Sequence, residues 1–282
     1  MCVRAKKSLP VKSDITVAIT LIYPTFTQGK IMKKQKQQTD VIVQITDLCK
    51  KYKGADKFAI TNINMECRAG EIVGLLGKNG AGKSTTIKCL TGYFPFDSGE
   101  IKICGHDIRT DGVAAKQNLG YVSDTRAMFD KMTGTEYVNF VADLHRTPLK
   151  QREERIAEMQ KVFHLGEKID ELIASYSHGM RQKICIMASL IHRPKLWLLD
   201  EPLTGLDPQT SKALREYMQV YKQQGNAVLY SSHNLDAVEK TCDRAYIINN
   251  GKLVSSIDIA KFKKKNPEKS LEDAFIEYFE ED

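Results

Sequence analysis

The sequence predicts an α/β fold in which a parallel sheet carries a phosphate-binding loop, with a small antiparallel β layer and an inserted helical region. Two short apolar runs, residues 72–76 and 196–199, are typical of strands buried on both faces of a parallel sheet. The first passes through glycines into a helical stretch and the second ends in two carboxylates. Residues 125–190, between these runs, have the pattern of helices, and 282 residues can bury a sizeable core.

The net charge of +7 is concentrated at the beginning of the chain. Eight of the 42 Lys and Arg residues but only two of the 35 Asp and Glu residues lie in residues 1–40. The remaining chain holds 34 basic and 33 acidic side chains and is therefore nearly neutral. A nucleic-acid-binding surface is usually strongly basic, so we expect no nucleic-acid partner.

Residues 1–40 are expected to be a disordered leader, or to lie partly upstream of the native start at Met32. Basic residues precede the apolar stretch 15–23, a pattern with two alternatives: a weak contact with a membrane surface, or a signal peptide. Nine residues are too short to span a bilayer, and no clear cleavage site follows them. The seven cysteines show no zinc-binding spacing, and their odd, scattered distribution fits a reducing compartment.

The first folded part is expected to be the antiparallel layer. Residues 41–75 and 98–108 contain short alternating strands separated by turn signals such as "DSGE". This layer would flank the core of the fold.

The stretch "GLLGKNGAGKSTT" fits the phosphate-loop pattern G-x-x-x-x-G-K-[ST] at Gly77, Gly82, Lys83 and Ser84. Glycines let backbone N–H groups approach phosphate oxygens, and the N-terminus of the following helix adds unpaired donors and its dipole. Lys83 would reach the β- and γ-phosphates, and Ser84 would offer its hydroxyl to Mg²⁺. The candidate nucleotide-binding residues of this loop are Gly77, Asn79, Gly80, Gly82, Lys83, Ser84 and Thr85.

The run "LWLLDE" places Asp200 and Glu201 at the carboxyl end of a predicted buried strand, where open α/β sheets bind ligands. We expect Asp200 to hold Mg²⁺ through water, and Glu201 to orient and polarise the attacking water. Together with the phosphate loop, this pair indicates a P-loop NTPase (RecA-like) core that binds ATP and Mg²⁺. A small-molecule kinase is still compatible with these two motifs.

A second glycine-bearing turn, "YSHGM", opens the predicted amphipathic helix that follows Gly179. Ser177 is a good N-cap, and the free N–H groups behind it form another anion site. Periodicity alone favours an ordinary capped helix. Earlier in the helical region, Thr133 and Glu136 form a capping-box pattern that predicts where a helix begins.

From about residue 41 to 255 the chain resembles the ATP-binding subunit of an ABC transporter, and its motifs come in that family's order. The phosphate loop resembles Walker A, "LWLLDE" resembles Walker B, and "YSHGMRQ" resembles the signature usually written LSGGQ. "GLD" at 205–207 resembles the D-loop, and "YSSHN" places His233 where the family has its switch histidine. A small-molecule kinase has none of the last three motifs.

The resemblance implies a site shared between two nucleotide-binding domains packed head to tail, with each signature covering the ATP held by the other chain. Ser177 and Gly179 would then grip the γ-phosphate across the interface, with Asp207 nearby. It also implies that Tyr52 stacks on adenine and that His233 acts with Glu201 in catalysis. Asp207 followed by Pro208 also predicts a helix start, and the two roles are compatible.

Two positions depart from the family pattern. His178 stands where the signature has its second glycine, and Asp124 stands where the family usually has a glutamine that contacts Mg²⁺. Aspartate is a strong ligand for hard metals, so Asp124 is a third candidate metal ligand beside Ser84 and Asp200. Some short-chain exporter subunits carry an acidic residue there, and the resemblance is to that subgroup.

The sequence therefore predicts an ATPase, peripheral on the cytoplasmic face of the membrane, that powers a separate permease, with export the favoured direction. The permease would face the helical subdomain, about residues 125–190. Residues 256–282 split into a basic and an acidic block and are expected to form a charged tail ending in a solvated helix. The alternatives are a soluble ABC ATPase acting on nucleic acid or ribosomes, and a non-catalytic partner subunit.

Overall fold

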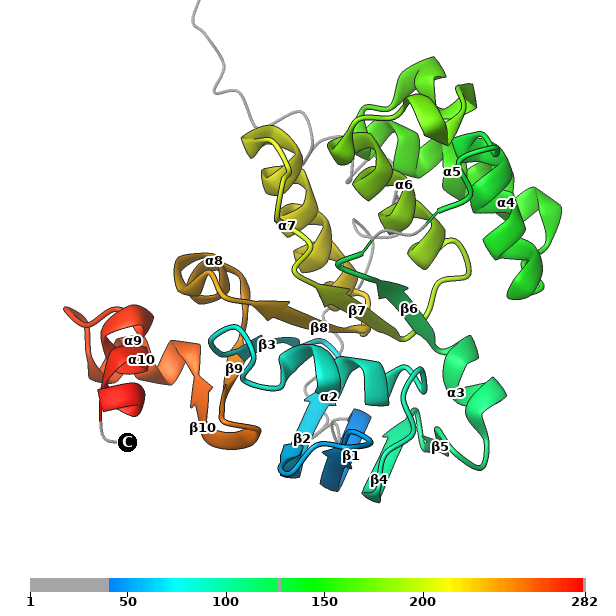
Figure 1. Cartoon of the computed structure of the whole chain (residues 1–282). Helices are drawn as coiled ribbons and strands as arrows, with labels where there is room; N and C mark the ends of the chain where they lie inside the picture. Colours follow the sequence, from blue (N-terminus) through cyan, green and yellow to red (C-terminus); the bar gives the residue numbers. More distant parts are fainter. Residues whose placement is uncertain (1–40, 126–127, 281–282) are drawn as a thin grey trace, which may run out of the picture.

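The computed structural model describes residues 41–125 and 128–280, with side chains placed through residue 276. The predicted leader lies outside the described residues. Two sheets and the helices around them account for most of the described chain (Figure 1).

The smaller sheet is antiparallel, with strand order β2-β1-β4-β5. Its strands are β1 (Val41–Lys51), β2 (Phe58–Arg68), β4 (Ser98–Ile103) and β5 (His106–Asp107). β1 and β2 have 11 residues each, so the prediction of short strands is wrong for this pair. Both strands are long because β1 pairs with β2 on one side and with β4 on the other. Register shifts within these pairings let each strand continue past local breaks in its alternating pattern.

The larger sheet has strand order β10-β9-β3-β8-β7-β6 and is parallel except for β10. Its strands are β3 (Ile72–Leu76), β6 (Leu119–Val122), β7 (Leu196–Asp200), β8 (Ala227–Ser232), β9 (Arg244–Asn249) and β10 (Lys252–Asp258). Every residue of β3, β7 and β8 is buried, as expected for strands covered on both faces. Because the strands are parallel, the segments that follow β3, β7 and β8 emerge at one edge, the carboxyl edge.

The two faces of the larger sheet pack into different cores. Helix α2 (Lys83–Leu90) packs with Val73 and Leu75 of β3 and with the antiparallel sheet, so it lies between the two sheets. Helices α7 (Pro208–Gln223) and α8 (Leu235–Thr241) pack on the opposite face, where Ile72 and Leu76 point.

Beyond the β6 edge the helical region extends away from the sheet (Figure 1). It contains α4 (Gly134–Leu144), α5 (Leu149–Phe163), the 3-10 turns η2 (Gly166–Asp170) and η3 (Ile173–Ser175), and α6 (His178–Leu190). The short helix α3 (Gly112–Gln117) leads into β6. The predicted capping box is confirmed: Thr133 Oγ1 accepts from the Glu136 N–H, and the Glu136 carboxylate accepts from the Thr133 N–H.

The C-terminal segment lies next to β10, at the other end of the sheet (Figure 1). It forms α9 (Ile259–Lys265) and α10 (Leu271–Glu280). The prediction of a solvated helix is wrong, because Leu271 is fully buried and Ala274 nearly so. The charge pattern of the sequence does not reveal the buried face that carries Leu271. Glu239 of α8 forms an ion pair with Lys263 at 3.0 Å and accepts a hydrogen bond from the Leu271 N–H at 2.6 Å.

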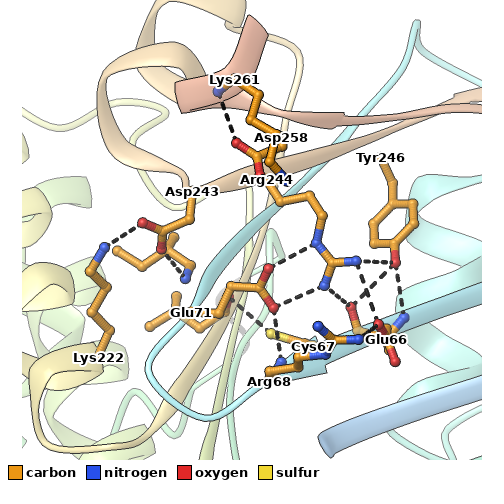
Figure 2. A network of polar contacts seen from close by, with 12 residues as sticks. Glu66, Cys67, Arg68, Glu71, Lys222, Asp243, Arg244, Tyr246, Asp258 and Lys261 are labelled. Carbon is orange, nitrogen blue, oxygen red and sulfur yellow. Dashed lines mark hydrogen bonds and ion pairs between the residues drawn. The ribbon is translucent and has the colours of Figure 1, made fainter. Parts of the chain in front are cut away.

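At the amino edge of the larger sheet, charged side chains form a dense network (Figure 2). Arg244 donates from Nε and Nη2 to the two carboxylate oxygens of Glu71, at 2.8 and 2.9 Å. Asp243 accepts from the Ile72 N–H at 2.8 Å and from Lys222 Nζ at 2.6 Å. The network joins β2, β3, β9 and the end of α7, so it fixes the small sheet and one helix to the parallel sheet.

Within the described residues, no helix is both long and apolar enough to cross a membrane. The six described cysteines are all unbridged.

Candidate functional site

The phosphate loop connects β3 to α2 at the carboxyl edge. Lys83, the first residue of α2, is 7% exposed, and its Nζ donates to the carbonyl oxygens of Gly77 at 2.7 Å and Lys78 at 3.3 Å. Burial lowers the pKa of Lys83, while the carboxylates of Glu201 and Asp200 act in the opposite direction. The side chain is therefore folded over the loop and lies within electrostatic reach of both carboxylates.

Two glycines of this loop leave no space for a side chain, and a third, Gly80, has a φ of +82° that favours glycine. A Cβ on Gly77 would lie 2.5 Å from the Ile248 carbonyl oxygen, so no side chain fits there. Gly82 has φ +115°, and a Cβ on it would lie 2.8 Å from Ile60. A Cβ on Gly80, in contrast, would meet nothing within 4 Å, which leaves the space above the loop open. Ser84 and Thr85 follow Lys83 in the first turn of α2 and are half-buried.

Ser231 of β8 contacts both residues at the neighbouring strand end, the carboxylate of Asp200 and the backbone N–H of Glu201. The Ser231 hydroxyl donates to Asp200 Oδ1 at 2.5 Å and accepts from the Glu201 N–H at 3.1 Å. Glu201 has φ +48°, a left-handed conformation that is unfavourable for a residue with a side chain. The turn separates the two side chains: Asp200 stays at the buried strand end, and Glu201 is more exposed.

Asp200 is 1% exposed, and its Oδ2 atom has no hydrogen-bond partner. Burial raises the pKa of Asp200, and the charges of Asp124 and Glu201 add to this, while the Ser231 hydrogen bond and Lys83 oppose it. A buried carboxylate oxygen without a donor is costly unless a cation satisfies it. The chemistry of this atom therefore fits a Mg²⁺ site, with Ser84 as the hydroxyl at the start of the adjacent helix.

His233 follows directly after β8, and its Nδ1 lies 3.0 Å from Glu201 Oε2. The structure thus brings together the two residues predicted as catalytic. The imidazole orients the carboxylate that follows β7, although the two residues are 32 positions apart in the sequence.

Tyr52 reaches the phosphate loop from the antiparallel sheet. Its hydroxyl lies 3.0 Å from Thr85 Oγ1, and its ring packs edge-on against Phe94 with 5.7 Å between centroids. The ring is 38% exposed, so one aromatic surface beside the loop is available for stacking.

Asp124 lies just after β6, is exposed, and accepts from the Ser123 hydroxyl at 3.2 Å. Its charge reaches Asp200 and contributes to the raised pKa there. Among the described residues, no group of three or more His, Cys, Asp or Glu side chains is arranged to hold a metal ion. A cation at Asp200 would therefore depend on hydroxyl, phosphate and water oxygens for its other ligands.

The second glycine-bearing turn lies elsewhere in the fold. Ser177 is confirmed as the N-cap of α6, because its hydroxyl accepts from the Met180 N–H at 3.3 Å. A Cβ on Gly179 would meet nothing within 4 Å, so the surface of this turn is open. Helix α6 packs in the core on one face of the larger sheet and α2 in the core on the other. The two phosphate-type turns therefore begin helices on opposite faces.

The segment after Glu201 approaches this second turn. Asp207 is confirmed as the N-cap of α7, with Pro208 in the first turn, and accepts from the N–H and the hydroxyl of Thr210 at 2.9 and 2.6 Å. These hydrogen bonds lower the pKa of Asp207. Gln182 of α6, which is fully buried, donates to the Pro202 carbonyl oxygen at 3.0 Å.

Sequence reasoning missed Ser231 and Gln182. Each joins segments that are 20 to 31 positions apart, and although Gln182 ends "YSHGMRQ" and Ser231 lies in "YSSHN", neither motif identifies the distant partner. The only sequence signal for Ser231 is its place in "YSSHN", two residues before the predicted catalytic histidine.

A groove of about 780 Å³ lies between the β6 edge and the helical region. On its wall the imidazoles of His145 and His192 stack, with 3.5 Å between centroids and 9° between planes. His192 Nε2 lies 3.1 Å from the Leu119 carbonyl oxygen and donates to it, while the Nδ1 atoms of both rings are buried without a partner. Burial lowers the pKa of His145, and burial together with His145 lowers the pKa of His192 to about 3.

Known proteins share both the sequence pattern and the fold. A family model described as "ABC transporter" matches residues 60–204. The chain is 36% identical to the linearmycin resistance ATP-binding protein LnrL of Bacillus subtilis (strain 168), over 71% of this chain and 64% of that protein. It thus spans just under two thirds of LnrL. It is 31% identical to the SkfA peptide export ATP-binding protein SkfE of the same organism, over 79% of this chain and 92% of SkfE.

Among solved structures, an ATP-binding subunit of an ABC transporter superposes with a TM-score of 0.79 at 28% identity. The match covers 84% of this chain and 99% of that one. The fold predicted from the sequence, with its P-loop NTPase core and antiparallel layer, is confirmed by this match and by the strand order. The chain belongs to the ABC transporter family and carries that family's ATP-binding, ATP-hydrolysing part.

Proposed function

We propose that this chain binds MgATP at the carboxyl edge of its larger sheet, hydrolyses it in a head-to-tail dimer, and powers a separate permease at the cytoplasmic face of the membrane. Export is the favoured direction, since a similar protein, SkfE, is named for peptide export. The observation that carries the proposal is that the two phosphate-type turns begin helices on opposite faces of the sheet. One nucleotide needs only one phosphate loop, so the second turn is best explained as serving the nucleotide of another chain.

Binding begins at the phosphate loop. The carbonyl oxygens that now accept from Lys83 are weaker partners for an ammonium group than phosphate oxygens, so the side chain would turn to the β- and γ-phosphates. The first-turn N–H groups of α2 and the open face above Gly80 provide the remaining cradle. Tyr52, beside Thr85, would stack on the adenine.

Hydrolysis depends on the cluster around Ser231. Glu201, oriented by His233 at 3.0 Å, is placed to accept a proton from the attacking water. His233 would then contact the γ-phosphate, since it follows β8 at the same edge and contacts Glu201. Bound Mg²⁺ would supply charge neutralisation to the phosphates, held by Ser84 and the unpartnered Oδ2 of Asp200.

Asp124 lies just after β6, at the same carboxyl edge of the sheet as Asp200. Its charge reaches Asp200, so we assign it to the metal side of the site. Asp124→Ala should raise the Mg²⁺ concentration that gives half-maximal ATPase activity. Asp130→Ala, which removes an exposed carboxylate of the same loop paired with Arg181, is the matched control. An identical Mg²⁺ titration for wild type and Asp124→Ala would remove Asp124 from the metal site.

The groove beside β6 is the surface we assign to the permease. It borders Ser123 and Thr125, on either side of Asp124, so a segment bound there would touch the loop that reaches the metal site. Among the described residues, Lys88 and Lys116 line it and no carboxylate does, which suits a permease segment that carries an acidic residue. We propose no nucleic-acid partner because the body of the chain is nearly neutral.

The composite site is tested by mixing two inactive variants, Lys83→Ala and Ser177→Arg, purified with the membrane subunits that accompany the chain. If signatures act on the other chain's nucleotide, a mixed dimer gathers both lesions into one site and leaves the other intact. Random pairing makes about half of the dimers mixed, so about a quarter of wild-type activity should return.

Ser175→Arg, which adds the same charge and bulk two residues before Ser177, is the matched control and should remain active. Exchange of subunits is verified with two affinity tags. If exchange occurs and no activity returns, the signature does not serve a second chain.

A further inference from the structure

His178 of the signature turn lies directly on Gly205 of the segment that follows the catalytic carboxylates. An ideal Cβ on Gly205 would be 2.6 Å from both Cδ2 and Nε2 of the His178 ring. Such a distance is well inside van der Waals contact, so the ring edge occupies the place of the side chain that glycine lacks. The contact joins residues that are 27 positions apart and belong to two different motifs.

Gly205 is required at this place for two separate reasons. Its φ of +76° is unfavourable for any residue with a Cβ, and the ring of His178 fills the space where a Cβ would project. His178 in turn stands where the family resemblance leads one to expect glycine. The bulky residue of the signature and the glycine of the other segment are therefore a matched pair.

A buried contact joins the same two segments. Gln182, one turn further along α6, donates to the Pro202 carbonyl oxygen at 3.0 Å. With His178 on Gly205, the first turns of α6 are thus connected to residues 202–205 at two points. Both His178 and Gly205 are exposed, so their contact lies on the surface that also presents Ser177 and Asp207.

We propose that His178 is a positioning residue that couples the signature turn to residues 204–207, so that both approach the nucleotide of the second subunit as one unit. This inference rests on the proposed head-to-tail dimer. A side chain larger than hydrogen at position 205 would force the ring away from Gly205 and change the surface that the signature turn presents to the second subunit. Replacing the ring with glycine would remove the contact on Gly205 and leave the hydrogen bond of Gln182 to Pro202 in place.

The test is a double-mutant cycle on ATP-driven dimerisation, measured by sedimentation in the hydrolysis-deficient Glu201→Gln background. We expect Gly205→Ala to weaken dimerisation by about tenfold or more, and His178→Gly by about threefold. In the His178→Gly background, the factor by which Gly205→Ala weakens dimerisation should be at least about fivefold smaller than when His178 is present. The strain of a positive φ is the same in both backgrounds and cancels in the cycle.

Two controls separate this effect from general damage. Gly225 has φ +79° and nothing within 4 Å of an ideal Cβ, so Gly225→Ala carries the backbone strain without the contact and should leave dimerisation unchanged. ATP affinity of the monomers, measured by fluorescence of a labelled nucleotide, should be unchanged in all variants because the phosphate loop begins α2, which packs on the opposite face of the sheet from α6.

The outcomes distinguish the two proposals. If the losses in dimerisation affinity are strictly additive and the Glu201→Gln parent dimerises normally with ATP, the coupling through His178 is overturned. The proposal of a head-to-tail dimer is then unaffected. A parent that fails to dimerise with ATP would overturn the head-to-tail site and the coupling with it.

Discussion

The two edges of the larger sheet are both rich in charged residues, yet their charges are arranged in opposite ways. At the amino edge each carboxylate has its partner: Glu71 accepts two hydrogen bonds from Arg244, and Asp243 accepts from Lys222 and a backbone N–H (Figure 2). At the carboxyl edge, Asp200 keeps one buried oxygen without a donor, and the ammonium group of Lys83 is bound to carbonyls.

Whether the charged groups have partners distinguishes the structural edge of the sheet from the functional edge more clearly than the number of charged residues does. The network around Arg244 is complete without any ligand, so its free energy already belongs to the folded chain. The cluster around Asp200 is incomplete, and the missing interactions are those that a metal ion and phosphates would provide. Substitutions at the two edges should therefore affect different measured quantities.

The largest effect is expected from Glu201→Gln. Loss of the carboxylate that receives the proton should lower kcat by about 10² to 10⁴, with ATP affinity nearly unchanged and the free energy of unfolding within about 0.5 kcal/mol of wild type. Glu71→Gln makes the same chemical change at the amino edge and should keep kcat while losing stability. Normal turnover of Glu201→Gln would exclude Glu201 as the base.

At the amino edge, Arg244→Met should lower the free energy of unfolding by about 2–3 kcal/mol and leave kcat unchanged. The side chains of Arg244 and Glu71 are 17% and 18% exposed. Their pair is therefore intermediate between exposed ion pairs, which contribute about 1 kcal/mol to stability, and buried ion pairs, whose disruption costs about 3–5 kcal/mol. Denaturant unfolding measures the loss. The double variant Glu71→Gln, Arg244→Met should recover part of it, because it leaves no unpaired carboxylate; a drop in kcat without destabilisation would contradict the structural role.

Asp200→Asn should raise the free energy of unfolding by about 1 kcal/mol while removing Mg²⁺-dependent hydrolysis. Burial raises the folded-state pKa of Asp200, so ionisation at neutral pH opposes folding. This cost grows as pH rises above the unfolded-state pKa of about 3.9, and the variant should lack that part of the pH dependence. Asn can still accept the Ser231 hydrogen bond. Thermal unfolding at pH 7 without Mg²⁺ is the measurement, and a less stable variant would mean that the carboxylate is already compensated.

The smallest effect concerns the stacked histidines of the groove, whose buried Nδ1 atoms also have no hydrogen-bond partner. The folded-state pKa of His192 is lowered to about 3, below the unfolded value of about 6.5. Between pH 7 and 5.5 the unfolded chain therefore binds more protons than the folded chain does. The free energy of unfolding should fall by about 0.5 kcal/mol over this range, a small change because the ring is only partly buried. His192→Phe should flatten this slope. His106→Phe, which changes a half-buried histidine outside this groove, is the matched control.

The sequence predicted the features that are local. The strand–loop–helix around Gly77 to Ser84, the capped starts of α4, α6 and α7, and the strand ending in Asp200 all depend on neighbours within a few residues. The family resemblance added the pairing of Glu201 with His233. Contacts between distant segments could not be read in this way.

Three such contacts illustrate the limit. Ser231 joins the Asp200 carboxylate and the Glu201 N–H across 31 and 30 positions, Arg244 joins Glu71 across 173 positions, and Glu239 fixes the tail through Lys263 and Leu271. The residue types involved are common on protein surfaces, and only the folded backbone decides which of them meet. The charge pattern of the tail predicts a solvated helix because the sequence does not show the surface of α8 on which the tail packs.

The left-handed backbone of Glu201 has a consequence for laboratory evolution. A glutamate at φ +48° stores strain that glycine or asparagine would relieve. A library selected only for resistance to heat will therefore enrich those two residues at position 201, and each enriched clone will have exchanged its turnover for a longer half-life.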